Sequence, residues 1–167
     1  MRKLICFIII LSFTILSACA MSENEFTPLA VEQTESAFKK DAHQVNQETK
    51  VFSYFLPDTF KVETKKDSNV LLNQKGQQYI LFVNSNEEMT SKRSYETLTQ
   101  TNKEPVIDET MEEEKRFGYL VVKKIEGSMY EVTVGIGGAK ITTESKANDV
   151  PDNAEQMMDI AKSIQIK

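Results

Sequence analysis

The chain has 167 residues, of which 40% are hydrophobic and 27% are charged, with 6 Gly and 4 Pro, a composition typical of one globular domain. Its 20 basic and 25 acidic residues give a formal net charge of −5, which disfavours nucleic acid and a bare anionic membrane as partners because both need a basic face. The single His excludes any metal site with two His ligands.

The first 18 residues have the features of a signal peptide. Arg2 and Lys3 make the start positive, and residues 4–18 are uncharged and mostly apolar. A helix that spans the hydrocarbon core needs about 20 residues, so this stretch suits an exported leader better than a transmembrane helix. Its removal leaves 18 basic and 25 acidic residues, and hence a net charge of −7.

The leader closes on Leu16-Ser17-Ala18-Cys19, which resembles the lipobox of bacterial lipoproteins. The resemblance implies cleavage between Ala18 and Cys19 and a diacylglycerol group on the Cys19 thiol, with two acyl chains sufficing as a stable anchor. It places the domain on the outer face of the cytoplasmic membrane, and the Lys-, Asn-, Glu- and Ile-rich composition favours a low-GC Gram-positive host. The alternatives are an ordinary signal peptide with an incidental cysteine, or a signal anchor.

Lipidation would also limit the chemistry of the mature chain. Cys6 lies in the leader, so Cys19 is the one cysteine that remains after cleavage. With its thiol consumed, no disulfide, no thiol nucleophile and no cysteine metal site is expected.

Residues 19–27 are polar and predict a lipid-anchored tether, and residues 28–167 predict a single domain. Thr27 as N-cap and Pro28 at the first helical position predict a helix start, and apolar spacing continues the helix to about residue 48. The stripe consists of Val31, Thr34, Phe38, Ala42 and Val45.

The first group of strands follows. The pattern predicts strands over 52–56, 60–64, 69–73 and 78–84, with turns between them. Residues 78–84 are apolar on both faces, which is typical of a central strand. Residues 85–94 are expected to form a loop, and residues 95–100 fit either a short helix or an extended piece.

The second group is more regular. Strands are predicted over 106–114, 117–125, 129–136 and 139–143, with a two-residue type II′ loop at Gly127-Ser128 and a bend at Gly137-Gly138. Asp152 and Glu155 predict a capping box at the start of a C-terminal helix. The apolar stripe of that helix is Met157, Ile160, Ala161 and Ile164.

The predicted fold is α+β: an antiparallel β-sheet flanked by an N-terminal and a C-terminal helix. The segment from Phe52 to Val62, in which an aromatic strand ends in Pro57-Asp58, resembles the opening hairpin of PsbP-like domains, and Met158 to Ile164 resembles their last helix. This likeness implies an α/β/α sandwich that binds or assists a larger assembly rather than catalysing a reaction. The chain also resembles small uncharacterised lipoproteins of Bacillota.

Few residues suggest chemistry. His43 falls on the polar side of the first helix, where a surface or packing role is expected. The segment from Gly135 to Lys140 is superficially similar to a phosphate loop, but β-forming residues follow it and Gly-Lys-Ser/Thr is absent, which favours a turn or bulge.

The densest acidic run lacks the alternating spacing of a calcium loop and predicts a solvated strand end. It consists of Asp108, Glu109, Glu112, Glu113 and Glu114. Asp149, Asp152 and Asn153 predict a loop leading into a helix cap. No catalytic residue, metal or cofactor is predicted, although an unmarked carboxylate pair of the glycosidase type is an alternative.

Aromatic residues are concentrated on the predicted sheet, where they either form core beneath the helices or line a groove. They are Tyr54, Phe55, Tyr79, Phe82, Tyr119 and Tyr130. The predicted function is a membrane-anchored extracytoplasmic lipoprotein that serves as a non-catalytic binding or accessory module for an envelope protein complex. The alternative is a small-ligand or cell-wall-binding receptor, and an envelope hydrolase is a third hypothesis.

Overall fold

The computed structural model describes residues 20–101 and 104–167. The predicted signal peptide, with Ala18 at its cleavage position, and the lipidation residue Cys19 lie outside the described residues. Within the described part of the chain, no helix has both the length and the apolar character needed to cross a membrane.

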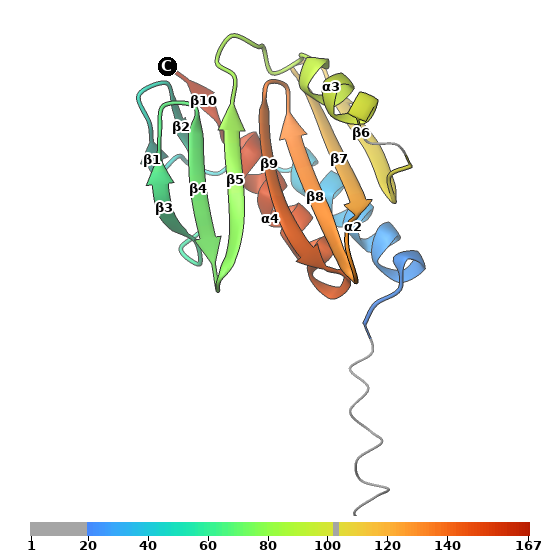
Figure 1. Ribbon diagram of the computed structural model, residues 1–167. Helices are drawn as coiled ribbons and strands as arrows, with labels where there is room; N and C mark the ends of the chain where they lie inside the picture. The colour runs from blue at the N-terminus through green and yellow to red at the C-terminus, as the bar shows by residue number, and fades with distance from the viewer. Residues whose placement is uncertain (1–19, 102–103) are drawn as a thin grey trace, which may run out of the picture.

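A seven-stranded antiparallel sheet forms the middle of the molecule, in the order β3-β4-β5-β9-β8-β7-β6 (Figure 1). Its strands are β3 (Lys61–Lys65), β4 (Asn69–Gln74), β5 (Gln77–Val83), β6 (Ile107–Glu113), β7 (Arg116–Lys124), β8 (Met129–Ile136) and β9 (Ala139–Lys146). Two runs of hairpins, β3-β4-β5 and β6-β7-β8-β9, meet where β5 pairs with β9. The sheet is therefore two meanders joined by one long-range pairing.

A second, three-stranded sheet has the order β1-β2-β10. It consists of β1 (Gln47–Glu48), β2 (Phe52–Tyr54) and β10 (Gln165–Ile166). The aromatic strand predicted over 52–56 is thus confirmed in part, because it is shorter and belongs to this small sheet. Phe52 and Tyr54 are fully buried in the main core.

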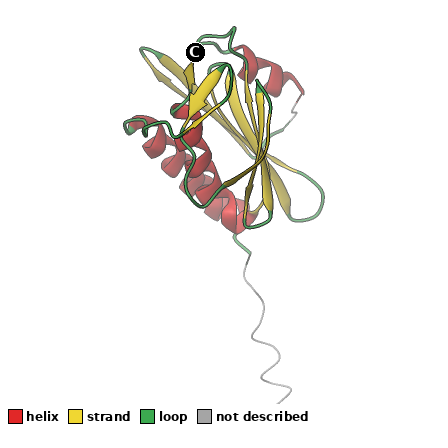
Figure 2. Cartoon of the chain, turned by 90° about the vertical axis from the view of Figure 1, so that its left-hand side faces the viewer, coloured by secondary structure: helices red, strands yellow, loops and turns green. Residues whose placement is uncertain are grey.

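Helices α2 (Glu23–Lys39) and α4 (Val150–Lys162) cover one face of the large sheet, and the shorter α3 (Arg93–Thr101) covers part of the other (Figures 1 and 2). A 3₁₀ turn, η1 (Ala147–Asp149), leads into α4. The predicted α+β domain, an antiparallel sheet flanked by an N-terminal and a C-terminal helix, is confirmed, and both of these helices pack on the same face of the sheet (Figure 2). The ambiguous segment 95–100 is helical.

The start of α2 differs from the prediction. The helix begins at Glu23, and the Glu25 carboxylate accepts hydrogen bonds from both the Ser22 amide (2.8 Å) and the Ser22 hydroxyl (2.7 Å). Ser-x-x-Glu is the capping-box pattern, and it places the helix start upstream of Pro28, which lies inside the helix. The predicted start at Thr27-Pro28 is wrong, and residues 23–27 belong to the folded domain rather than to a tether.

The end of α2 also differs, because the helix stops at Lys39 rather than near residue 48. The buried Lys162 ammonium of α4 donates to the carbonyl oxygen of Ala37 in the last turn of α2. A cation at the carbonyl end of a helix satisfies an acceptor that has no partner within the helix and interacts favourably with the helix dipole. Beyond this point the Asn46 side chain holds the extended chain by hydrogen bonds with the Leu56 backbone.

A small aromatic cluster lies between α3 and the sheet. Phe117, Tyr119 and Val121 of β7 pack against Tyr95 and Leu98 of α3. The Tyr119 ring lies directly over Gly135 of β8, so close that a Cβ atom there would be 2.2 Å from the ring. Glycine is therefore required at position 135 by this close approach.

Three further expectations need correction. The β7–β8 hairpin is confirmed, but its loop spans residues 125–128 and is longer than the predicted two residues. The predicted capping box of Asp152 and Glu155 is wrong, because α4 begins at Val150 with Asp149 as N-cap. Strand β5 is internal as predicted, but its second face is not buried, since Ile80 is 54% exposed.

Acid should loosen the start of α2. The Lys124 ammonium (2.8 Å) and the Tyr130 hydroxyl (3.0 Å) donate to Glu23 Oε1 and hold the pKa of that carboxyl below its ordinary value. Because the pKa is lowered in the folded state, the stabilisation is complete above the ordinary pKa and is lost as pH falls through the folded-state pKa. We expect urea midpoints measured between about pH 6 and about pH 3 to fall less for Glu23→Gln than for wild type. Glu32→Gln, an exposed acid on the same helix, is the control and should follow wild type.

Candidate functional site

The joint between the two meanders opens into a fork. Strand β5 pairs with β9 only from Tyr79–Thr143 to Val83–Ala139. Beyond Tyr79, β5 continues beside β4 alone, while β9 continues beside β8 as far as Lys146. The two central strands therefore diverge at one end of the sheet.

Side chains replace the missing ladder at the fork. The Thr143 hydroxyl donates to the Gln78 carbonyl oxygen (2.6 Å) and accepts from the Gln77 side-chain amide (3.0 Å). The bond to Gln78 satisfies a backbone carbonyl that a continuing strand pair would have satisfied. Specific hydrogen bonds therefore stabilise the two strands where they diverge.

A buried network from α4 braces the fork from behind. The Tyr79 hydroxyl donates to Asn153 Oδ1 (2.7 Å), and Asn153 Nδ2 donates to the Ser145 hydroxyl (2.8 Å). Burial, with a smaller effect from the Asp149 carboxylate, raises the pKa of Tyr79 to about 12. The Tyr79 hydroxyl therefore stays protonated at neutral pH and keeps donating this bond.

The front of the fork is a cleft of about 770 Å³, which we call the fork cleft. It is lined by Gln77, Gln78 and Ile80 from β5 and by Glu131, Thr142 and Glu144 from β8 and β9. Lys146 and Asp149 also line it, where β9 passes into η1. Helix α3 covers a different part of this sheet face (Figure 1), and no residue of α3 lines the cleft.

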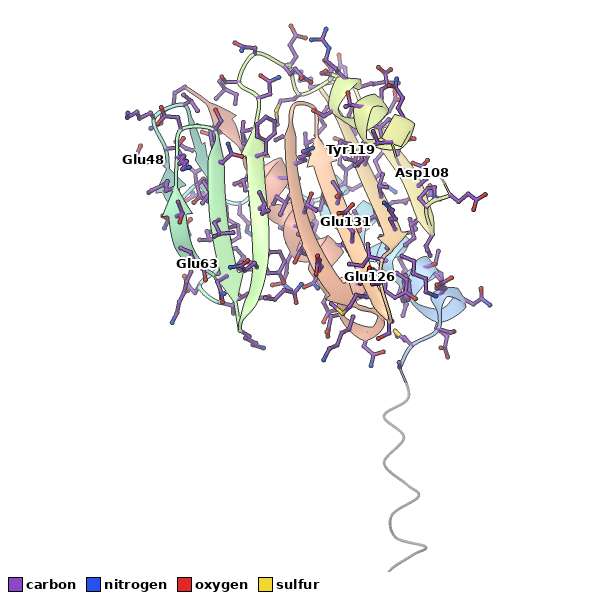
Figure 3. All side chains as sticks on the ribbon, in the orientation of Figure 1. Glu48, Glu63, Asp108, Tyr119, Glu126 and Glu131 are labelled. Atoms are coloured by element: carbon purple, nitrogen blue, oxygen red, sulfur yellow. The ribbon has the colours of Figure 1, made fainter. Side chains whose placement is uncertain are left out.

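Two acids face each other across neighbouring strands of this cleft. Glu131 of β8 is directly opposite Glu144 of β9 in the sheet register (Figure 3 labels Glu131). Like charges in directly opposed positions destabilise a sheet. Lys123 is opposite Glu131 on the other side, but in the described part of the chain neither carboxylate is within salt-bridge distance of a basic side chain. The cleft is negative, with three carboxylates and one ammonium.

Apolar surface lies next to these acids. Ile80 is paired with Leu71 of β4 and Thr142 of β9, and more than half of its side chain reaches solvent. Phe82 lies two residues further along β5, with the Lys140 ammonium 5.9 Å from its ring centroid. An apolar surface beside carboxylates and amides suits an extended segment that carries both apolar and basic side chains.

The structure places the remaining predicted residues away from this cleft. His43 is not on a helix, since it lies in the segment after α2, stacked on Phe55 (4.4 Å between ring centroids) with Nε2 3.8 Å from Asp159. Asp108, Glu109, Glu112 and Glu113 lie on the edge strand β6, and Glu114 in the turn after it, as expected for a solvated strand end. The segment from Gly135 to Lys140 forms the β8–β9 hairpin, as predicted.

Asn153 is a residue whose role the sequence reasoning missed. The sequence pattern predicts a loop and helix cap at Asp149, Asp152 and Asn153, yet Asn153 is buried inside α4 and bonds across to the sheet. Of the six aromatic residues, four are buried, whereas Phe55 and Phe82 are half-buried. In the described part of the chain, no three His, Cys, Asp or Glu side chains come together in a way that could hold a metal ion.

The chain was compared with protein families, curated sequences and solved structures. No family model matches the chain, and no curated protein sequence matches it. Among solved structures, the chain is similar to the solution structure of cyanobacterial PsbP (CyanoP) from Synechocystis sp. PCC 6803, with 15% sequence identity and a TM-score of 0.42, over 74% of this chain and 92% of that one.

Two tyrosines offer a matched test of the brace behind the fork. We expect Tyr79→Phe to lower the free energy of unfolding by about 1–2 kcal/mol, because Asn153 Oδ1 loses its donor. Tyr119→Phe also removes a buried hydroxyl, but this hydroxyl has no hydrogen-bond partner in the described part of the chain. The free energy of unfolding should therefore stay the same or rise by up to about 1 kcal/mol. Urea denaturation measures both, and equal losses would contradict the assigned network.

Proposed function

We propose that this chain is a lipoprotein held on the outer face of the cytoplasmic membrane by a diacylglycerol group on Cys19. In this proposal it is a non-catalytic binding or accessory module for an envelope protein complex. Support for the anchor comes from the leader of residues 1–18 and from Leu16-Ser17-Ala18-Cys19, where a small residue precedes the cysteine.

The observation that carries the binding role is the exposed Ile80 beside the opposed acids Glu131 and Glu144. Full burial of an isoleucine side chain is worth about 1.5–3 kcal/mol, and Ile80 is left more than half exposed on an internal strand. A partner that covers it gains the part of this apolar term that is still exposed, and it relieves the repulsion between the two carboxylates if it brings positive charge.

The partner is, by this chemistry, an extended segment of an envelope protein with basic and apolar side chains. The partner needs basic side chains because the cleft contains three carboxylates. It needs apolar side chains because the sheet around Ile80 is uncovered. A weak interface is sufficient, because restriction of both molecules to one membrane raises their effective concentration.

The anchor has a direct test. We expect Cys19→Ser to shift the protein from the washed membrane fraction to the soluble fraction or the medium, since the acyl chains supply the binding free energy. Immunoblotting of the fractions measures the shift, and Ser17→Ala, which keeps a small residue in the lipobox, is the control. Equal retention of Cys19→Ser and wild type would refute the anchor.

The binding surface can be tested by site-specific photo-cross-linking in intact cells. A photoreactive phenylalanine analogue in place of Ile80 should form an adduct with a membrane-associated protein. The same analogue in place of Leu29, a 38% exposed apolar residue on α2, should not. Glu131→Lys combined with Glu144→Lys should reduce the adduct at position 80 severalfold, because a basic partner is then repelled. Equal adducts at positions 80 and 29, or an adduct unaffected by charge reversal, would refute the proposed surface.

A further inference from the structure

Only three residues connect the proposed lipid-bearing Cys19 with the first helix. They are Ala20, Met21 and Ser22, and α2 begins at Glu23. The Met21 side chain is partly buried against the main core, and its backbone N–H donates to Asn148 Oδ1 of η1. The connector is therefore part of the folded domain almost from its first residue.

The residues that follow are fixed just as firmly. Ser22 is bound twice by the Glu25 carboxylate, and Glu23 is bound by Lys124 and Tyr130, one on each strand of the β7–β8 hairpin. Phe26, in the same turn, packs edge-to-face on the Tyr130 ring with 4.9 Å between centroids. These contacts join the start of α2 to one end of the sheet.

Such a connector leaves almost no slack. Consecutive Cα atoms are about 3.8 Å apart, so Cys19 lies no more than roughly 8 Å from Met21 in any conformation. A flexible tether of about nine residues would instead let the domain turn freely at a distance of roughly 15 Å.

We propose that the domain stands on the membrane in one orientation, with the β7–β8 loop (residues 125–128) and η1 facing the phospholipid headgroups of the outer leaflet. This inference rests on the proposed anchor at Cys19. In Figure 1 the chain reaches α2 at the end of the sheet where this loop and η1 lie, and the loop between β5 and α3 lies at the opposite end. Strand β8 has 8 residues, so the two ends are separated by about 27 Å.

The short connector, rather than charge attraction, sets this orientation. The membrane-facing end carries Lys124, which is already paired with Glu23, and the exposed Glu126 of the loop. Lys146 and Asp149 at the same end have opposite charges. Because no basic excess is present there, an anionic surface would not orient the domain by itself.

The orientation also decides how the fork cleft is reached. Lys146 and Asp149, which line the cleft, lie where β9 passes into η1, at the membrane-facing end. A partner segment that occupies the cleft therefore begins close to the bilayer. This favours the juxtamembrane part of a membrane protein over a segment presented far from the surface.

A single introduced tryptophan tests the orientation, since the chain contains no Trp. Glu126→Trp marks the β7–β8 loop, and Glu48→Trp marks β1 at the far edge of the molecule from that loop (Figure 3). Full-length lipidated protein is purified from membranes and reconstituted in phosphatidylglycerol–phosphatidylethanolamine vesicles that contain a headgroup-nitroxide lipid. We expect the emission of Glu126→Trp to fall by roughly half and that of Glu48→Trp to stay unchanged, because a strand length of about 27 Å separates the ends.

A lengthened connector is the matched control. Six Gly and Ser residues inserted between Ala20 and Met21 add roughly 13 Å of flexible reach, so quenching at position 126 should drop to the level seen at position 48. Equal quenching at both positions without the insert, or quenching at position 126 that the insert does not change, would overturn the inference. A failure of the proposed anchor would be seen in a different experiment, as retention of Cys19→Ser in the membrane fraction.

Discussion

Helices α2 and α4 pack against each other and against a single face of the seven-stranded sheet, and this packing shapes the rest of the molecule. The Lys162 ammonium, buried between the helices, donates to the Ala37 carbonyl and so joins the end of α2 to α4. The two long helices, α2 and α4, therefore both lie on that face (Figure 2). On the other face, the short α3 covers the aromatic cluster around Tyr119. The neighbouring strands β3, β4, β5 and β9 are open to solvent on this face (Figure 1).

The fork between β5 and β9 lies at the centre of the open face, and it follows from the topology of the sheet. Two hairpin runs are local in sequence, and only the pairing of β5 with β9 joins them. This joint ends at Tyr79 and Thr143, where Thr143 and Asn153 bond to groups on the diverging strand. The sheet is therefore split, acidic and partly apolar at one place, which is the surface that the proposed partner would cover.

The start of α2 links this surface to the proposed anchor. Glu23 and Phe26 fix the first turn of α2 to the β7–β8 hairpin. The Met21 amide bonds to Asn148 of η1, and the cleft ends at the same η1. The first turn of α2 and the cleft therefore lie at the same end of the domain. Under the proposed anchoring, this is the end that would face the membrane.

Much of the fold follows from local sequence. Alternation in Met129–Ile136 and the spacing of Met157, Ile160 and Ala161 identify strand and helix correctly, because each pattern reports which side of one element is buried. Gly137-Gly138 marks a two-residue loop, and such a loop sets the register that brings Glu131 opposite Glu144. Ser22 and Glu25 also carried a start signal that the more conspicuous Pro28 obscured. The exposure of Ile80, the end of α2 at Lys39 and the fork itself were decided only by tertiary structure. Each depends on residues more than 60 positions away, such as Lys162 for Ala37 and Thr143 for Gln78, and a periodicity within one segment holds no information about such partners.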